Sequence, residues 1–362
     1  MTLPLASAHA SRLEFLDECG STNTELISRA ADAWPDFSVV ATGNQTAGRG
    51  RLDRVWVAPP GQTLAVSVLL RPSFSLERYG WLPLIAGLAM AGAVESTLPE
   101  PATLSELATL PEPAPLPELV EGRAAALRSG EWRFEGGQNS QIPDLTEEVL
   151  PAAPLSELAP LSELAPLSEL APLSELVEGG AADENRALRP FDRLRAPQAQ
   201  GATTPLVAIK WPNDVQLDGL KVSGLLAELL PTADGVVIGA GLNLTIPADG
   251  LPTPNATSLI LHGADPHDLL DRALAAYLRE LKQLYSTFVE HGGEAEASGI
   301  RLLVQQRCST VGQQIRVELP GGETRYGKAT GIDELGRLVY TDRADASVQA
   351  VAAGDVTHLR YE

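Results

Sequence analysis

Runs of β-branched and aliphatic residues along the chain predict strands, and three longer segments between them have the composition or spacing of helices. Val, Ile and Thr favour strands, and apolar residues spaced three and four apart favour an amphipathic helix. Asp-Gly at 218–219 adds a hairpin signal. The pattern therefore predicts an α+β domain, a mixed and largely antiparallel sheet backed by helices. Strands are expected over 13–18, 38–42, 63–71, 206–211, 225–230 and 236–243, and helices over 24–33, 79–95 and 266–288.

The tail follows a different pattern. Residues 312–319 alternate polar and apolar positions, and Gly-rich turns separate further short strand-like runs up to the C-terminus. Short strands with Gly turns in about 50 residues are typical of a small β-barrel. We therefore predict a catalytic domain from 11–97 plus 205–306 and a separate C-terminal domain over 309–362.

Residues 98–204 interrupt the domain. They carry 18 acidic and 7 basic residues and 14 of the 28 prolines, and Ala-Pro-Leu-Ser-Glu-Leu repeats through 153–176. Proline removes a helix donor, and six residues is too short a period for a helical solenoid. The composition is typical of a low-complexity, disordered insertion; a docking segment for a partner is the alternative.

Charge and cysteine usage exclude several classes of protein. The 362 residues carry a net charge of −20, which argues against a nucleic-acid or anionic-membrane partner. The chain lacks an apolar run long enough to cross a membrane, and its five histidines show no metal-ligand spacing. Two cysteines cannot form a disulfide scaffold, so we expect a reducing, cytoplasmic location.

Four stretches carry candidate chemistry. In 44–56, glycines at 48 and 50 let the backbone approach a ligand closely, and Arg49, Arg51 and Arg54 together could bind an anion such as a phosphate. A solvated basic loop is the plain alternative. Lys-Trp-Pro-Asn-Asp at 210–214 ends a strand and places a carboxylate where it could orient an amine, although ordinary turn chemistry would also explain it.

The other two stretches follow the predicted hairpin. Lys221 begins Lys-Val-Ser-Gly-Leu-Leu-Ala-Glu and could bridge a carboxylate and a phosphate, or simply protect an edge strand. Gly-Ala-Gly-Leu-Asn-Leu at 239–244 lacks the third glycine of a dinucleotide fingerprint, so we reject a Rossmann domain. Asn243 could still hydrogen-bond a nucleotide.

Together with Ser-Thr-Asn at 21–23, these stretches in this order resemble the catalytic domain of the biotin protein ligases, across 11–97 and 205–290. Leu-Leu-Arg-Pro at 69–72 and Ala-Thr-Ser-Leu at 256–259 extend the match. Gly-Lys-Ala-Thr-Gly-Ile-Asp-Glu-Leu-Gly-Arg-Leu, from residue 327, resembles the small SH3-like C-terminal domain of that family. Each motif is weak alone, and their common order makes the match specific.

The resemblance implies ATP-dependent transfer of biotin, through biotinyl-5′-AMP, to a lysine of a biotin carboxyl carrier domain, with Mg²⁺ on the triphosphate. Arg51, Lys221 and Asp214 are the implied catalytic residues, with Asp214 orienting the acceptor lysine. No protein-bound metal is expected. The implied biotin site is Ser21, Thr22, Asn23, Gln45, Arg49, Gly50, Arg51 and Lys221, and the implied ATP site is Arg49, Arg51, Trp56, Lys210 and Asn243.

Roughly 20 residues precede Ser21, so we expect the monofunctional class without the family's DNA-binding domain, and no operator binding. A homodimer is left open. Two alternative functions remain: lipoate or octanoyl transfer on the same fold, which the missing Arg-Arg-x-Ser-Gly-Gly-Gly stretch disfavours, and a non-catalytic biotin-binding regulator, which Arg51, Lys221 and Asn243 disfavour.

Overall fold

A seven-stranded mixed sheet organises the larger part of the chain. The computed structural model describes residues 2–51, 55–56, 58–99, 206–319 and 323–352, and the backbone of 355–358. Nearly all of the predicted insertion, and Arg54, lie outside these ranges. The sheet order is β1-β2-β5-β9-β8-β7-β6, parallel only between β1 and β2. Its strands are β1 (Arg12–Leu16), β2 (Ser38–Thr42), β5 (Thr63–Leu70), β6 (Val207–Lys210), β7 (Asp214–Leu217), β8 (Leu220–Leu229) and β9 (Val236–Asn243).

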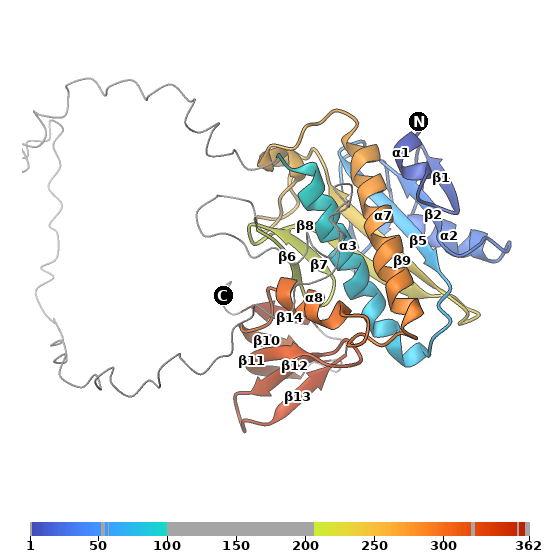
Figure 1. Cartoon of the computed structure of the whole chain (residues 1–362). Helices are drawn as coiled ribbons and strands as arrows, with labels where there is room; N and C mark the ends of the chain where they lie inside the picture. The colour runs from blue at the N-terminus through green and yellow to red at the C-terminus, as the bar shows by residue number, and fades with distance from the viewer. Residues whose placement is uncertain are drawn as a thin grey trace, which may run out of the picture. The chain divides into compact units, whose positions relative to one another are not determined.

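Two helices cover one face of this sheet and bury the main core (Figure 1). The apolar helix α3 (Leu82–Thr97) lies beside α7 (Leu269–Glu290), whose apolar residues recur at helical spacing. Burying a large apolar side chain contributes about 1.5–3 kcal/mol, so this layer supplies much of the stability. Besides α2 (Thr22–Ala30), the other helices and turns of the described residues are α1 (Pro4–Ser7), η1 (Leu76–Trp81), η5 (Ala248–Gly250), η6 (Leu259–His262) and α8 (Ile300–Arg307).

The alternation along β9 divides the two faces of the sheet. Val236, Ile238, Ala240 and Leu242 belong to the main core beneath α3 and α7. The intervening positions point to the other face, where Val237 joins a smaller apolar cluster with Leu26 of α2 (Thr22–Ala30). Because successive side chains of a strand point to opposite faces, Gly239, Gly241 and Asn243 also lie on the α2 face.

The bounds of all three predicted helices differ from the expectation. The first helix begins at Thr22 instead of 24 and ends at Ala30 instead of 33. The second occupies 82–97 instead of 79–95, after the 3₁₀ turn η1, and proline stands in its first turn. The third begins at Leu269 instead of 266. Proline fixes φ and lacks an N–H, so it fits the first turn of α3 and explains that start.

A second, five-stranded antiparallel sheet forms the C-terminal part, in the order β13-β12-β11-β10-β14. This confirms the predicted class, while closure into an SH3-like barrel stays a prediction. The Trp81 and Trp211 indoles donate to the carbonyl oxygens of Glu334 and Gly336, joining the β11–β12 turn to the larger sheet. The strands of the C-terminal sheet are β10 (Gln314–Glu318), β11 (Thr324–Ile332), β12 (Leu338–Asp342), β13 (Val348–Val351) and β14 (Asp355–His358).

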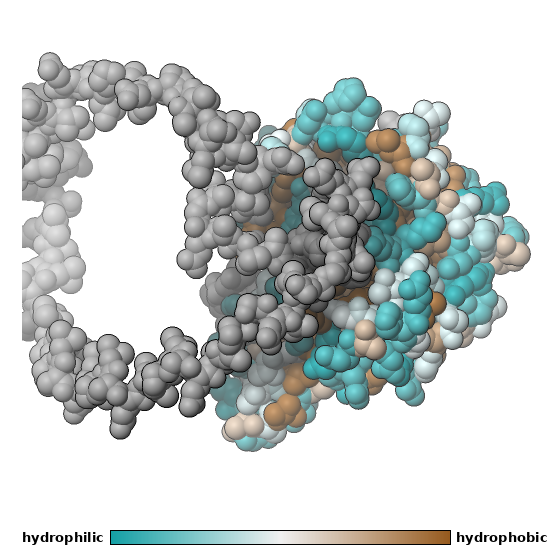
Figure 2. Space-filling view, viewed as in Figure 1, coloured by the Kyte–Doolittle hydropathy of each residue, from teal (hydrophilic) through white to brown (hydrophobic). Residues whose placement is uncertain are grey.

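The described surface is largely hydrophilic on the face shown in Figure 2, with hydrophobic residues in small separate areas. Within the described ranges, every helix is too short or too polar to cross a lipid bilayer.

Candidate active site

A cavity of about 500 Å³ opens on the α2 face of the large sheet. Its walls come from α2, the loop that carries the short strands β3 (Gly48–Arg49) and β4 (Val55–Trp56), and strands β7 to β9. Every residue of the implied catalytic, biotin and ATP sites lines this one cavity. These residues are Ser21, Thr22, Asn23, Gln45, Arg49, Gly50, Arg51, Trp56, Lys210, Asp214, Lys221 and Asn243.

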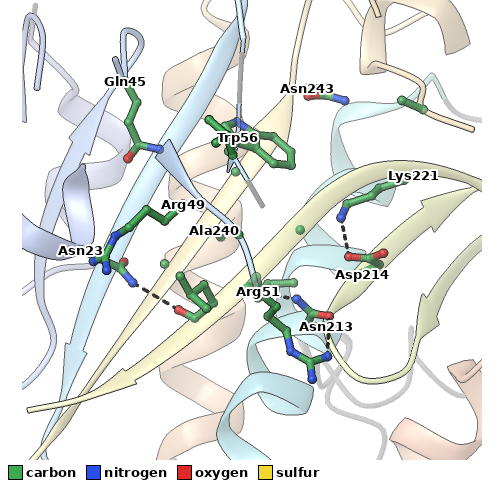
Figure 3. Close-up of a pocket in the computed structure, with 18 of the residues that line it drawn as sticks. Asn23, Gln45, Arg49, Arg51, Trp56, Asn213, Asp214, Lys221, Ala240 and Asn243 are labelled. Carbon is green, nitrogen blue, oxygen red and sulfur yellow. Dashed lines mark hydrogen bonds and ion pairs between the residues drawn. The ribbon is translucent and has the colours of Figure 1, made fainter. Parts of the chain in front are cut away.

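Neutral hydrogen-bonding groups gather at one side, where Figure 3 shows Asn23 and Gln45. The Thr22 backbone N–H donates to Gln45 Oε1 over 2.9 Å, and its hydroxyl lies 3.1 Å from the same oxygen. The first N–H groups of a helix have no partner within the helix, so Gln45 takes the role of a cap. Ser21 is a residue type that commonly caps helices, and it occupies the N-cap position, but its side chain makes no capping bond.

Ser67 and Glu228 fix the side chain of Asn23. The Ser67 hydroxyl donates to Asn23 Oδ1 over 2.5 Å, and Asn23 Nδ2 donates to Glu228 Oε2 over 2.6 Å. Glu228 Oε1 also pairs with Arg49 Nη2 at 3.0 Å. Sequence reasoning gave neither Ser67 nor Glu228 a role. Glu228 is the last residue of the Lys221 motif and lies on the sheet face that borders the cavity. Its place in that motif was the sequence signal that could have pointed to its role.

Glycines let these side chains lie directly on the sheet. A Cβ on Gly239 would come within 2.2 Å of Asn23 Oδ1, and one on Gly241 within 2.6 Å of Trp56 Cε2. A Cβ on Gly224 would meet Lys221 at 3.0 Å. The glycines of the 239–241 stretch therefore serve close packing at the cavity, and not the phosphate turn of a dinucleotide fold.

Lys221 and Arg51 lie away from Asn23 and Gln45 in the cavity, whereas Arg49 lies beside Asn23 (Figure 3). Lys221 Nζ lies 2.6 Å from Asp214 Oδ1 and 5.9 Å from the centre of the Trp56 ring. Arg51 Nη1 donates to Asn213 Oδ1 over 3.4 Å, which links its loop to the β6–β7 turn. Lys221 and Asp214, predicted separately, thus form one ion pair at the cavity wall.

Asn243 is oriented by a backbone contact. It is 3% exposed, and its Nδ2 donates to the Thr257 carbonyl oxygen over 2.8 Å. Because Nδ2 is committed there, the amide presents Oδ1 as an acceptor on its other side. The nearby Trp56 Nε1 is buried without a hydrogen-bond partner among the described residues, so it offers a donor to a ligand.

Cysteine nucleophiles do not fit this site. Cys19 and Cys308 are both buried, and burial raises the pKa of the Cys19 thiol to about 11, with Glu25 adding to the effect. A thiol needs a lowered pKa to attack at neutral pH. The cavity instead supplies hydrogen bonds at one side and positive charge at the other, which suits a substrate with a neutral polar head and a phosphate.

Comparison with known proteins agrees with this geometry. A sequence model described as "Biotin/lipoate A/B protein ligase family" matches residues 18–106 and 164–243, and one described as "Biotin protein ligase C terminal domain" matches 310–359. A biotin–[acetyl-CoA-carboxylase] ligase of Mycobacterium tuberculosis is 28% identical over 351 residues, covering 96% of this chain and 90% of the relative. The chain belongs to the biotin protein ligase family.

Further similarities to biotin protein ligases support the assignment. A biotin–[acetyl-CoA-carboxylase] ligase of Paracoccus denitrificans is 34% identical over 160 residues, covering 41% of this chain and 62% of the relative. The crystal structure of the Aquifex aeolicus biotin protein ligase has a TM-score of 0.53 at 17% identity, covering 96% of this chain and 99% of that chain, which shows a shared fold. The first family description covers both biotin and lipoate ligases, and the description of the C-terminal match names biotin protein ligases alone.

Proposed function

We propose that this chain is a biotin–[biotin carboxyl-carrier protein] ligase. One observation carries the proposal: a single cavity joins the neutral cluster of Thr22, Asn23 and Gln45 to the cations Arg51 and Lys221. The uncharged ureido head of biotin needs neutral donors and acceptors, and its carboxylate and ATP need positive charge.

In the first step, a biotin carboxylate oxygen attacks the α-phosphorus of ATP, and the bond to the β-phosphate breaks. The products are biotinyl-5′-AMP and pyrophosphate. Two anions approach each other here, so cations that meet the developing charge lower the barrier. We assign this role to Arg51 and Lys221, while Arg49 lies beside Asn23 and contacts Glu228. Asn243, Trp56 and Lys210 would bind the nucleotide, and Ser21 and Gly50 would complete the biotin site.

In the second step, the amine of a carrier lysine attacks the acyl carbon of the mixed anhydride, AMP leaves, and the amine loses a proton. We assign Asp214, the ion-pair partner of Lys221, to orient that amine. Closure of the 48–56 loop would keep water from the anhydride. The partner is the biotin carboxyl carrier domain of a carboxylase.

Mg²⁺ would enter with the nucleotide. The described residues contain no group of three or more His, Cys, Asp or Glu side chains arranged to hold a metal ion. We assign Mg²⁺ to the triphosphate, whose negative charge it would neutralise.

Mass spectrometry of a purified carrier domain, incubated with this protein, biotin and MgATP, tests the proposal. The expected result is a mass increase of one biotinyl group at one lysine. Lipoate or octanoate in place of biotin should give no transfer; transfer of either would favour the acyl-ligase alternative. Biotin binding without pyrophosphate release would favour a regulator, and a carrier of unchanged mass would contradict the ligase.

A further inference from the structure

Asp218, His262 and Thr257 form a hydrogen-bonded series behind the cavity wall. His262 Nδ1 lies 3.3 Å from Asp218 Oδ2, and His262 Nε2 lies 2.9 Å from Thr257 Oγ1. Asp218 belongs to the β7–β8 turn, and His262 ends η6. A neutral imidazole satisfies both contacts at once, with Nδ1–H donating to the carboxylate and Nε2 accepting from the hydroxyl.

The order carboxylate, imidazole, hydroxyl is that of a hydrolase triad, but the burial of Thr257 excludes that chemistry. Thr257 is 2% exposed, and the described residues that line the cavity include its neighbour Ala256 but not Thr257. A nucleophilic hydroxyl must reach its substrate. The series therefore holds Thr257 in place.

Thr257 in turn holds two groups of the cavity. Its carbonyl oxygen accepts the hydrogen bond from Asn243 Nδ2 over 2.8 Å. Its N–H donates to the Lys221 carbonyl oxygen over 2.8 Å, and the Lys221 N–H donates to Asn255 O over 2.7 Å. A shift of the 255–257 segment would move the Asn243 amide and the start of β8 together.

We propose that His262 is a positioning residue for the nucleotide side of the cavity, acting through Thr257 on Asn243 and Lys221. The inference rests on the proposed function, in which Asn243 binds the nucleotide and Lys221 meets the charge that develops in the first step. It predicts that loss of His262 weakens productive use of ATP more than that of biotin, whose neutral contacts lie across the cavity.

The Thr257 contact should matter more than the Asp218 contact. The side chain of His262 is 16% exposed and that of Asp218 is 48% exposed, and an exposed charge pair contributes little. The amide of Gln reaches the position of Nε2, whereas that of Asn reaches the position of Nδ1. His262→Gln can thus keep the Thr257 contact, and His262→Asn only the Asp218 contact.

The test measures pyrophosphate release at varied ATP and at varied biotin for the wild type, His262→Ala, His262→Gln and His262→Asn. We expect His262→Ala to raise KM for ATP about 3- to 10-fold, because that is the effect of losing one hydrogen bond. The same variant should change KM for biotin less than about 2-fold. His262→Gln should lie closer to the wild type than His262→Asn.

The matched control is His267→Ala, because His267 makes the same 3.3 Å contact with an aspartate, Asp268, but its side chain is 82% exposed. This variant should keep both KM values. An unchanged KM for ATP in His262→Ala, or equal rises in both KM values, would overturn the inference. If His262→Ala fails to fold by thermal melting, equal KM values for ATP in the Gln and Asn variants would overturn it.

A wild type that releases no pyrophosphate with biotin and ATP marks failure of the proposed function instead. A wild type that works, with His262 variants that match it, marks failure of this inference alone.

Discussion

At the scale of single residues, the site depends on charges and on missing side chains. Lys221 stands at the cavity wall with one ion-pair partner, Asp214, and its side chain is 38% exposed. Gly239 and Gly241 matter because they have no Cβ. A Cβ on Gly239 would collide with Asn23, and one on Gly241 would collide with Trp56. Both kinds of residue can be tested by single substitutions that spare the main core.

Lys221→Ala should abolish adenylate formation in a protein that still folds. Removing a donor that meets developing charge costs about 10²–10³-fold in rate. Pyrophosphate release on adding biotin and MgATP measures it, and circular dichroism checks the fold. Lys328→Ala, which removes an exposed lysine of the C-terminal sheet, is the matched control. Near-normal release by Lys221→Ala would refute the assignment.

Gly239→Ala should weaken biotin binding about tenfold or more. The new Cβ would lie 2.2 Å from Asn23 Oδ1, and Asn23 can only move aside by breaking its bonds to Ser67 and Glu228, each worth about 0.5–1.5 kcal/mol. Isothermal titration with biotin measures the change. In Gly92→Ala, on α3, the Cβ would lie 3.5 Å from Glu280, an ordinary contact, so that control should bind normally.

At the scale of elements, the cavity forms where a loop meets two strand ends. The loop that carries β3 and β4 contacts the β6–β7 turn through Arg51 and Asn213, and contacts β8 through Arg49 and Glu228. Arg49 is half-exposed, so its ion pair adds little stability. The Arg51 and Arg49 contacts can hold the loop over the cavity, and they can break when the loop moves away.

Arg51→Gly should let biotinyl-5′-AMP escape while its synthesis continues. The Arg51 contact ties the loop to the opposite side of the cavity, so its loss should raise leakage more than it slows the first step. The measurement is the labelling of a lysine-rich bystander protein, with the carrier domain and wild-type enzyme in parallel. If the variant labels the carrier alone, another residue retains the intermediate.

At the scale of the whole molecule, the two described ends beside the central segment lie close to each other. Pro99 Cγ lies 3.5 Å from where a Cβ on Gly263 would be. His262, next to Gly263, contacts Asp218, and Asp218 Oδ1 accepts from the Leu206 N–H over 2.9 Å. One short series of contacts thus connects the residues that precede and follow the segment.

Replacing 99–203 with a short Gly/Ser linker should therefore leave ligase activity intact. All the cavity residues lie outside the segment, and closing a loop between neighbouring ends costs only logarithmically in its length. Assays of both half-reactions measure the result, alongside a thermal melt. A raised KM for the carrier with normal adenylation would favour a docking arm, and a deletion protein that cannot fold would make the segment part of the core.

Local pattern was enough for most strands of the large sheet and for one turn. It did not predict β7 as a strand, and β8 begins at Leu220 instead of 225. The β9 bounds agree with the alternation of residues 236–243, and the turn forms at Asp218 and Gly219, whose φ angles are both positive. Strand alternation and turn chemistry depend on neighbouring residues, so a sequence contains them directly. The order of the motifs also predicted residues that line one cavity.

Contacts between distant residues were decided by the tertiary structure. The short helix α1 was not predicted, because its Leu5 and Ala6 N–H groups donate to the carboxylate of Asp271, far along the chain. The same holds for Glu228, which acquires a role only when β8 brings it to Asn23, and for His262, whose partners Asp218 and Thr257 meet through the fold. Hydrogen bonds act over about 3 Å, and only folding brings such residues that close.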